Sequence, residues 1–238
     1  MATGPRAATT ARTATATATA TTAALLAFVA ASNPRAAFAA ESPSAEPPTP
    51  QTVHLSLPFS GVWGVIQGFD SGTHVGYAAF ALDFVPAQPA GTRAPRRGAP
   101  LARFACYGRP VLAPADGAVV AAHAGSRDWP GYTKGRDQGN YVILEHAPGE
   151  YTEFRHLAAH SVTLAVGDRV HRGDVIGRCG NSGNATTPHL HIGFLSSIDP
   201  ITTRLMTLSG YEVMNVDGTW HEGDGTPQKG EILRPFAD

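Results

Sequence analysis

The spacing of glycine and proline is the feature that most limits how this chain folds. After residue 50, these two residues interrupt the sequence at close intervals, and only short apolar runs lie between them. Several runs alternate, as in Tyr141-Val142-Ile143-Leu144-Glu145-His146, and none keeps a period of 3.6 residues over three turns. We therefore predict an all-β fold of antiparallel strands with little helix, and residues 201–208 are the only modest helix candidate. The expected strands are residues 53–59, 77–85, 111–113, 118–122, 141–146, 151–157, 175–178 and 189–195.

The first 39 residues have a composition unlike the rest. They carry three arginines and no acid. A Thr/Ala run at 11–22 and an apolar core at 23–31 precede the small-residue site Ala37-Phe38-Ala39. This order is typical of a secretory signal, with cleavage expected before Ala40. A membrane anchor is the alternative, but the apolar core has about half of the roughly 20 residues that a spanning helix needs.

Charge and composition exclude several partners. Removal of the signal leaves 18 − 3 = 15 basic residues against 19 acidic ones, a formal net charge of −4. No charge field of a single sign indicates nucleic acid, and we expect no membrane contact after cleavage. Residues 41–50 are proline-rich and nearly devoid of apolar side chains, which predicts a linker.

Two cysteines, Cys106 and Cys179, are present. This number excludes a structural zinc site built from cysteines. Each precedes or ends an expected strand, so the two can lie close together. A disulfide and a pair of buried thiols both remain open, and export favours the disulfide.

The segment Thr187-Pro188-His189-Leu190-His191 indicates chemistry. Side chains two residues apart in a strand share a face, so His189 and His191 point the same way while Leu190 points to the other face. Two neighbouring imidazoles suit a metal ion, although two surface histidines would give the same pattern. Further ligands elsewhere in the chain would decide between these interpretations.

Candidates for such ligands lie in two other expected strands. Asp83 interrupts an apolar run that follows His74, and a buried carboxylate must be paired or metal-bound to offset its desolvation. His156 lies within residues 151–157. His74, Asp83 and one histidine of the pair would supply three ligands and leave a fourth position for water, as in catalytic zinc sites.

Five segments in this order resemble the lysostaphin-type (LytM-type) zinc metallopeptidases. They are residues 139–146, residues 151–157, residues 166–177 with two Gly-Asp pairs, Gly180-Asn181-Ser182-Gly183 and Pro188-His189-Leu190-His191. The resemblance runs from about residue 61 to residue 195. It implies an antiparallel β-sheet groove fold with a duplicated hybrid motif, one Zn²⁺ per chain, and hydrolysis of peptide bonds in bacterial peptidoglycan.

Carried over residue by residue, the resemblance assigns His74, Asp83 and His191 as zinc ligands. It assigns His156 and His189 as catalytic residues beside the metal. The family pattern has three residues between the first histidine and the aspartate, whereas eight separate His74 from Asp83 here. We expect His74 to lie on a longer loop before the strand that carries Asp83.

These observations predict a secreted, extracytoplasmic zinc endopeptidase that acts as a monomer on cell-wall peptidoglycan. Two alternatives are a catalytically weak relative that binds cell wall or regulates another hydrolase, and a zinc hydrolase with a non-wall substrate. The expected organisation is a signal peptide at 1–39, a proline-rich linker at 40–58, a zinc metallopeptidase domain at 59–200 and a C-terminal extension at 201–238 that packs on that domain.

Overall fold

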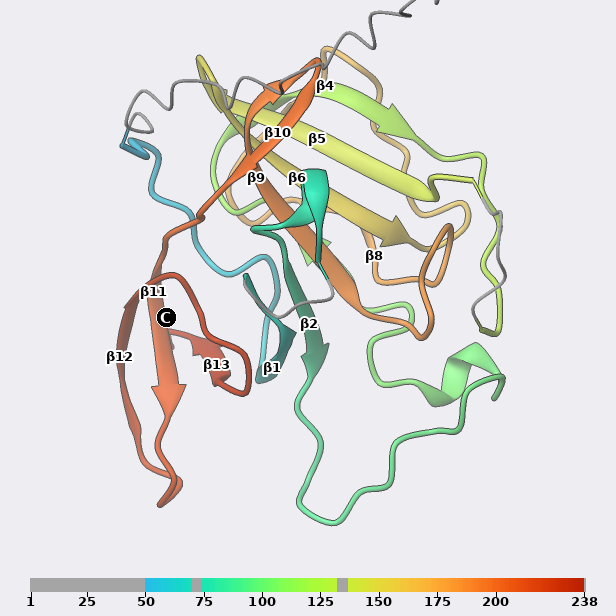
Figure 1. Cartoon of the computed structure of the whole chain (residues 1–238), viewed down its shortest axis with the longest axis vertical. Coiled ribbons are helices and arrows are strands. Elements are labelled where there is room, and N and C mark those ends of the chain that lie inside the picture. Colours follow the sequence, from blue (N-terminus) through green and yellow to red (C-terminus); the bar gives the residue numbers. More distant parts are fainter. Residues whose placement is uncertain (1–49, 70–73, 132–136, 238) are drawn as a thin grey trace, which may run out of the picture. The chain divides into compact units, whose positions relative to one another are not determined.

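The computed structural model describes residues 50–69, 74–131 and 137–237. The predicted signal peptide lies outside these residues. The fold is all-β and antiparallel, as the sequence predicted, and the described residues contain two short 3₁₀ turns but no α-helix (Figure 1). Its elements are β1 (Trp63–Gln67), η1 (Gly76–Ala78), β2 (Leu82–Pro86), η2 (Leu101–Arg103), β3 (Pro110–Leu112), β4 (Gly117–His123), β5 (Asn140–Ala147), β6 (Glu150–Leu157), β7 (Arg169–Val170), β8 (Val175–Arg178), β9 (Leu190–Ile198), β10 (Ile201–Arg204), β11 (Leu208–Met214), β12 (Trp220–Gly225) and β13 (Ile232–Pro235).

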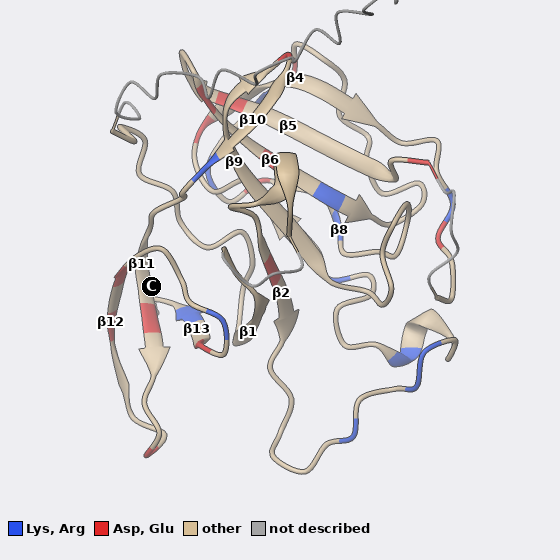
Figure 2. Ribbon diagram, in the orientation of Figure 1, with Lys and Arg blue, Asp and Glu red and all other residues tan. Residues whose placement is uncertain are grey.

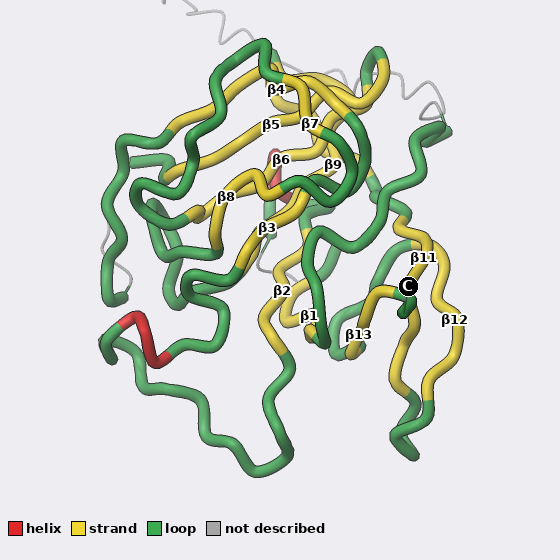
Figure 3. The backbone as a smooth tube through the Cα atoms, turned by 180° about the vertical axis from the view of Figure 1, so that it is seen from behind, coloured by secondary structure: helices red, strands yellow, loops and turns green. Residues whose placement is uncertain are grey.

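One sheet contains eleven of the described strands, in the order β12-β11-β13-β1-β2-β9-β6-β5-β4-β7, and β10 pairs with β9. A second sheet contains β3 and β8 (Figure 3). The named strand pairs are all antiparallel. The order places β9, which comes late in the chain, between β2 and β6, and so joins the N-terminal strands to the middle of the chain.

Side chains of strand β9 alternate between the hydrophobic core and the face that carries the site. Leu190, Ile192 and Phe194 are fully buried in the hydrophobic core, and this core extends to β2 and β6 through Phe84 and Phe154. The intervening side chain of His191 points to the opposite face. Figure 2 shows no Lys, Arg, Asp or Glu on β9 and a single acidic position, Asp83, on β2.

Cys106 and Cys179 form a disulfide across 73 positions, with 5.7 Å between their Cα atoms. The bond ties the segment before β3 to the end of β8, and both half-cystines are buried. The sequence left open whether these residues are joined, and the structure settles the question in favour of the disulfide.

The helix expected at residues 201–208 is wrong. Residues 201–204 form β10, which returns along β9 with Ile201 opposite Ile198 and Arg204 opposite Phe194. Leu208 then begins β11. Ile201, Thr202 and Thr203 are β-branched, and their χ1 stiffness favours a pleated strand over a helix.

Two strand predictions also need correction. Residues 53–59 form no regular strand. Leu55, Leu57 and Phe59 are buried, as is Pro58, but only Leu55 makes a bridge, to Leu208. The expected strand at 77–85 starts only at Leu82, because residues 76–78 form the turn η1. Besides β10, five strands were not anticipated: β1, β7, β11, β12 and β13.

We find no helix among the described residues with the length and apolar character to cross a membrane.

Candidate metal centre and catalytic groove

The site is built from one row of residues across four neighbouring strands. Gln67 of β1 faces Asp83 of β2, Asp83 faces His191 of β9, and His191 faces Arg155 of β6. Directly opposed residues of an antiparallel pair have Cβ atoms about 5 Å apart. Strand register alone therefore brings a carboxylate and an imidazole from distant parts of the chain into contact.

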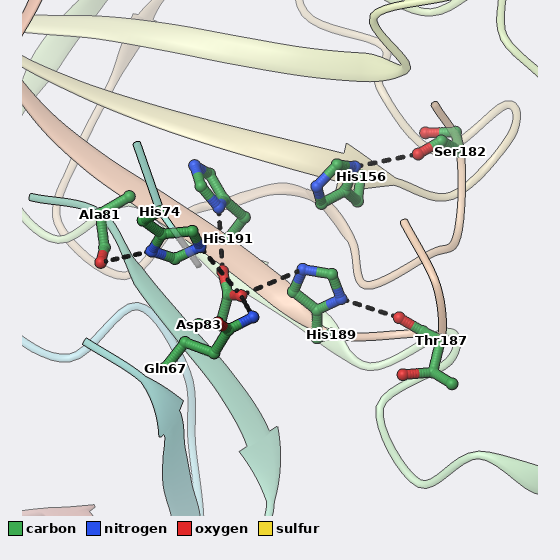
Figure 4. A network of polar contacts seen from close by, with 9 residues as sticks. All are labelled: Gln67, His74, Ala81, Asp83, His156, Ser182, Thr187, His189 and His191. Atoms are coloured by element: carbon green, nitrogen blue, oxygen red, sulfur yellow. Dashed lines mark hydrogen bonds and ion pairs between the residues drawn. The ribbon is translucent and has the colours of Figure 1, made fainter. Parts of the chain in front are cut away.

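Asp83 is the centre of a network of polar contacts (Figure 4). Its side chain is almost fully buried. Oδ1 lies 2.9 Å from His191 Nδ1, and Oδ2 lies 3.2 Å from His74 Nε2 and 3.6 Å from His189 Nε2. Gln67 Nε2 donates a hydrogen bond of 3.1 Å to Oδ2. The carboxylate is thus surrounded by three imidazoles and one amide.

His74 precedes β2 on a segment that turns through η1 before the strand begins. The long spacing does not separate His74 from Asp83, because this turn folds the imidazole back over the carboxylate. His74 Nδ1 donates to Ala81 O over 3.0 Å, which fixes the ring. The structure therefore places His74 where the sequence expected it, on a loop before the strand that carries Asp83.

Three histidines of the site are oriented by backbone carbonyls. Nδ1 of His74, His156 and His189 lies within 3.0 Å of Ala81 O, Ser182 O and Thr187 O, respectively. A carbonyl oxygen only accepts, so each Nδ1 carries a proton, which leaves Nε2 of each ring to contact other groups of the site. This arrangement is common for histidines that bind metals or transfer protons.

His156 reaches the site through a β-bulge. Asn140 pairs with Leu157 and Val142 with Phe154, so β6 has one more residue than β5 at this point. His156 has a φ of +61°, which is uncommon for a non-glycine residue. Strict alternation would place it on the core side with Phe154. The bulge turns it instead to the cavity that Arg155 lines.

The turn before β9 holds His156 from the other side. Ser182 O accepts the hydrogen bond from His156, and Ser182 Oγ donates to Leu157 O over 2.7 Å. Gly183 follows with a φ of +65° and packs against Gly139, where an added Cβ would lie only 2.6 Å from the Gly139 nitrogen. This close backbone approach needs glycine.

The pKa shifts differ between Asp83 and His156. Burial raises the pKa of Asp83, but the adjacent His189 and the hydrogen bonds with His191 and His74 outweigh it, and the net pKa lies well below its ordinary value. Burial, together with His189 and His191, lowers the pKa of His156 well below 6.5. Burial lowers the pKa of His74, but Asp83 reverses this effect and the net pKa is raised. Asp83 is therefore ionised and His156 neutral near pH 7.

The five predicted site residues all line one cavity of about 760 Å³. Within it, His74, Asp83 and His191 offer one ligand atom each within 4.8 Å of one another, and so do His156, His189 and His191. Ligand atoms of a tetrahedral zinc lie about 3.3 Å apart, given bonds of about 2.0–2.1 Å. Two imidazoles and a carboxylate are the N/O donors that zinc accepts, and the first group also supplies a charge that offsets that of the metal. The residues therefore fit zinc.

Sequence reasoning missed Gln67 and Arg155. Gln67 has no motif around it, and only the β1–β2 register shows that it hydrogen-bonds to Asp83. Arg155 stands directly before His156, where an arginine inside an otherwise buried strand was an available signal. Among the other histidines, His146 contacts Asp116 O and Thr152 Oγ1 instead of the site.

The described antiparallel sheet brings together His74, Asp83 and His191, a donor set of the kind that binds zinc in metal-dependent hydrolases. Residues 98–202 match the model of peptidase family M23. This segment is therefore similar to that family, and the His/Asp cluster of the chain is typical of the zinc peptidases in it. The matched region includes His156, His189 and His191, whereas His74 and Asp83 precede it.

The chain is similar to the peptidoglycan DD-endopeptidase ShyA of Vibrio cholerae, with 38% identity over 84 residues that cover 35% of this chain and 17% of ShyA. It is similar to the glycyl-glycine endopeptidase ALE-1 of Staphylococcus capitis, with 36% identity over 88 residues that cover 37% of this chain and 22% of ALE-1. The aligned region thus spans about a fifth of the length of these curated relatives. Among solved structures, the catalytic domain of lysostaphin from Staphylococcus simulans has 22% identity and a TM-score of 0.33, covering 64% of this chain and 80% of that one.

Proposed function

We propose that this protein is a secreted zinc endopeptidase that hydrolyses peptide bonds in bacterial peptidoglycan. The observation that carries the proposal is one cavity that Asp83 and His191 line in contact with each other and that His156 and His189 also line, each with Nδ1 bonded to a backbone carbonyl. The match of residues 98–202 to peptidase family M23 supports the reaction class, and the wall substrate is inferred from that family.

In this proposal His74, Asp83 and His191 hold the metal. A zinc ion held there would supply Lewis-acid chemistry, which polarises a scissile carbonyl and lowers the pKa of a water molecule. The chain contributes the imidazoles of His156 and His189, whose ring centroids lie 4.9 Å apart. One Nε2 takes the proton of the attacking water. That proton then passes to the leaving amine. The other imidazole, with a proton on Nε2 taken from solvent, donates a hydrogen bond to the developing oxyanion; the proposal does not divide these two roles between His156 and His189.

The pKa and the orientation of His156 both suit a proton acceptor. The lowered pKa of His156 keeps its buried imidazole neutral near pH 7, so Nε2 of this ring can accept a proton. The hydrogen bonds to Ser182 O and Thr187 O hold both rings in one tautomer. Gln67 holds Asp83 in place by donating to Oδ2.

Export remains part of the proposal. The disulfide between Cys106 and Cys179 supports an extracytoplasmic location, because such bonds persist in oxidising compartments. The secreted chain should then begin within two residues of Ala40, and mass analysis of the mature N-terminus checks this start.

Zinc analysis of the purified protein, followed by turbidity loss of isolated cell walls with and without a chelator, tests the function. We expect about one zinc per chain and a chelator-sensitive loss of turbidity. Full zinc without hydrolysis of any substrate would favour a weak relative that binds or regulates. Activity confined to non-wall substrates would favour a hydrolase of another kind.

A further inference from the structure

Arg155 is a buried cation beside the candidate catalytic residues. Its side chain lines the cavity, and among the described lining residues it is the one Lys or Arg. It is only 7% exposed and faces His191 directly across β6 and β9. An arginine is costly to bury, so this position calls for an explanation.

Neighbouring side chains hold the guanidinium of Arg155 in place but do not use all of its hydrogen-bond donors. Glu153 Oε1 lies 2.5 Å from Nη2. The rings of Tyr141 and Tyr77 lie 5.4 Å and 5.7 Å from the guanidinium carbon. A guanidinium has five N–H donors, and Nη2 carries only two of them. Within the described residues, Nε is buried and has no hydrogen-bond partner, so the donors that a ligand could reach are those on Nη1 and Nη2. The group is therefore oriented and retains donor capacity.

The planar fork of an arginine matches a carboxylate in geometry and in charge. In a peptide, the α-carboxylate of the residue that supplies the leaving amine is two bonds from the scissile nitrogen. Arg155 adjoins the His191 position, so a carboxylate at that distance from the scissile bond comes within its reach. A glycine bridge offers only uncharged amides at the same place.

We propose that Arg155 is a specificity-determining residue that binds a free carboxylate next to the scissile bond. The substrates would then be wall peptides whose cleaved linkage adjoins an unblocked carboxylate, such as stem linkages between D-amino acids, and not glycine bridges. The proposal rests on the function proposed above. It distinguishes between two kinds of substrate linkage: the DD-linkage in the name of ShyA and the glycyl-glycine linkage in the name of ALE-1.

Paired peptides test the proposal on the zinc-loaded protein. Each pair has the same sequence and differs only in a free carboxylate or a carboxamide on the residue beyond the scissile bond, and a glycine-bridge peptide forms a third arm. The intact protein should prefer the free acid by about tenfold or more in kcat/KM, mainly through KM. Arg155→Gln should bring the ratio of acid to amide close to one with its zinc content unchanged, and Arg155→Lys should restore part of the preference.

Arg204→Gln is the matched control. The side chain of Arg204 is also largely buried, with 12% exposed. It lies 3.6 Å from Glu150 and stacks on Phe194, but it does not line the cavity. This variant should keep the preference for the free acid. A loss of kcat in Arg155→Gln that is equal for acid and amide would overturn the proposal, because it would indicate a structural role or oxyanion stabilisation.

Binding separates this inference from the proposed function. Calorimetry with the His189→Ala variant measures affinity for the same peptide pair without turnover. A preference for the acid that disappears in the His189→Ala/Arg155→Gln double variant supports the inference even if no wall peptide is hydrolysed. Equal affinity for acid and amide would refute it, whether or not the protein is an endopeptidase.

Discussion

His191 Nδ1 lies 2.9 Å from Asp83 Oδ1, although 108 positions separate the two residues. The contact follows from the pairing of β2 with β9, in which these residues are directly opposed. A slip of one residue in this register would move His191 to the core face and break the cluster. The site therefore depends on long-range sheet pairing, and features that stabilise the sheet and its turns should affect activity.

The disulfide should contribute substantially to stability. Joining Cys106 to Cys179 closes a loop across 73 positions, and loop-closure entropy predicts about 4 kcal/mol of stabilisation. The Cys106→Ala/Cys179→Ala double variant should lose about that much free energy of unfolding, measured by urea denaturation. Thiol titration of the unfolded, unreduced protein should find no free thiol, and two titrating thiols would contradict the bond.

Gly183→Ala should damage the support of His156. An added Cβ would clash with Gly139, and the positive φ strains any other residue, so we expect a loss of about 2 kcal/mol in stability. The displaced Ser182 carbonyl would release His156, and kcat should fall by about tenfold with zinc retained. Gly167→Ala is the control, since its φ is also positive but nothing lies within 4 Å of the added Cβ. Unchanged kcat in Gly183→Ala would argue against this positioning role.

Part of the site could be predicted from the sequence because it obeys local rules. The i, i+2 spacing placed His189 and His191 on one face, and both line the cavity. His156 obeys no such rule, since only the bulge in β6 turns it to the cavity side. Its assignment depended on the resemblance to a family. Local patterns fail in the same way at Gln67, whose role depends on the β1–β2 register.

Strands could be predicted from the sequence where apolar and polar side chains alternate clearly. The runs that became β5, β6 and β9 were recognised because their apolar side chains recur every second residue. Residues 53–59 alternate too, but their polar backbone groups find irregular partners, such as Pro114 O for the Ser56 nitrogen. The short β10 run contained too few residues to separate a strand from a helix. Such segments take their structure from the neighbours they pair with.

Glu150 should make stability depend on pH in the acid range. Burial raises its pKa, but hydrogen bonds from Thr52 and Val53 and the charge of Arg204 outweigh it, so the folded pKa lies below the ordinary value of 4.5. The unfolded chain therefore binds the proton more readily. The stabilisation is complete above the unfolded pKa and is lost as pH falls through the folded pKa.

Comparison with Glu150→Gln isolates this contribution. Denaturation curves from pH 7 to pH 3 should show the intact protein more stable by about 1 kcal/mol at neutral pH, and the difference should shrink below about pH 4.5. Glu222→Gln, at an exposed strand position, is the control and should follow the intact protein. A difference that grows toward low pH would mean that the sign of the shift is wrong.

The most specific prediction about the site divides its residues into metal ligands and catalytic residues. His74→Ala, Asp83→Ala and His191→Ala should each lower zinc occupancy and activity together. His156→Ala and His189→Ala should keep zinc and lose a factor on the order of 10² or more in kcat. His146→Ala, whose imidazole bonds to Asp116 O and Thr152, should change neither.

The competing cluster of His156, His189 and His191 makes one comparison decisive. Zinc content and kcat are measured on the same preparations of His74→Ala and His156→Ala. We predict that His74→Ala loses zinc and activity, whereas His156→Ala retains about one zinc per chain and loses turnover. Full zinc in His74→Ala together with zinc loss in His156→Ala would contradict the account and place the metal in the other cluster.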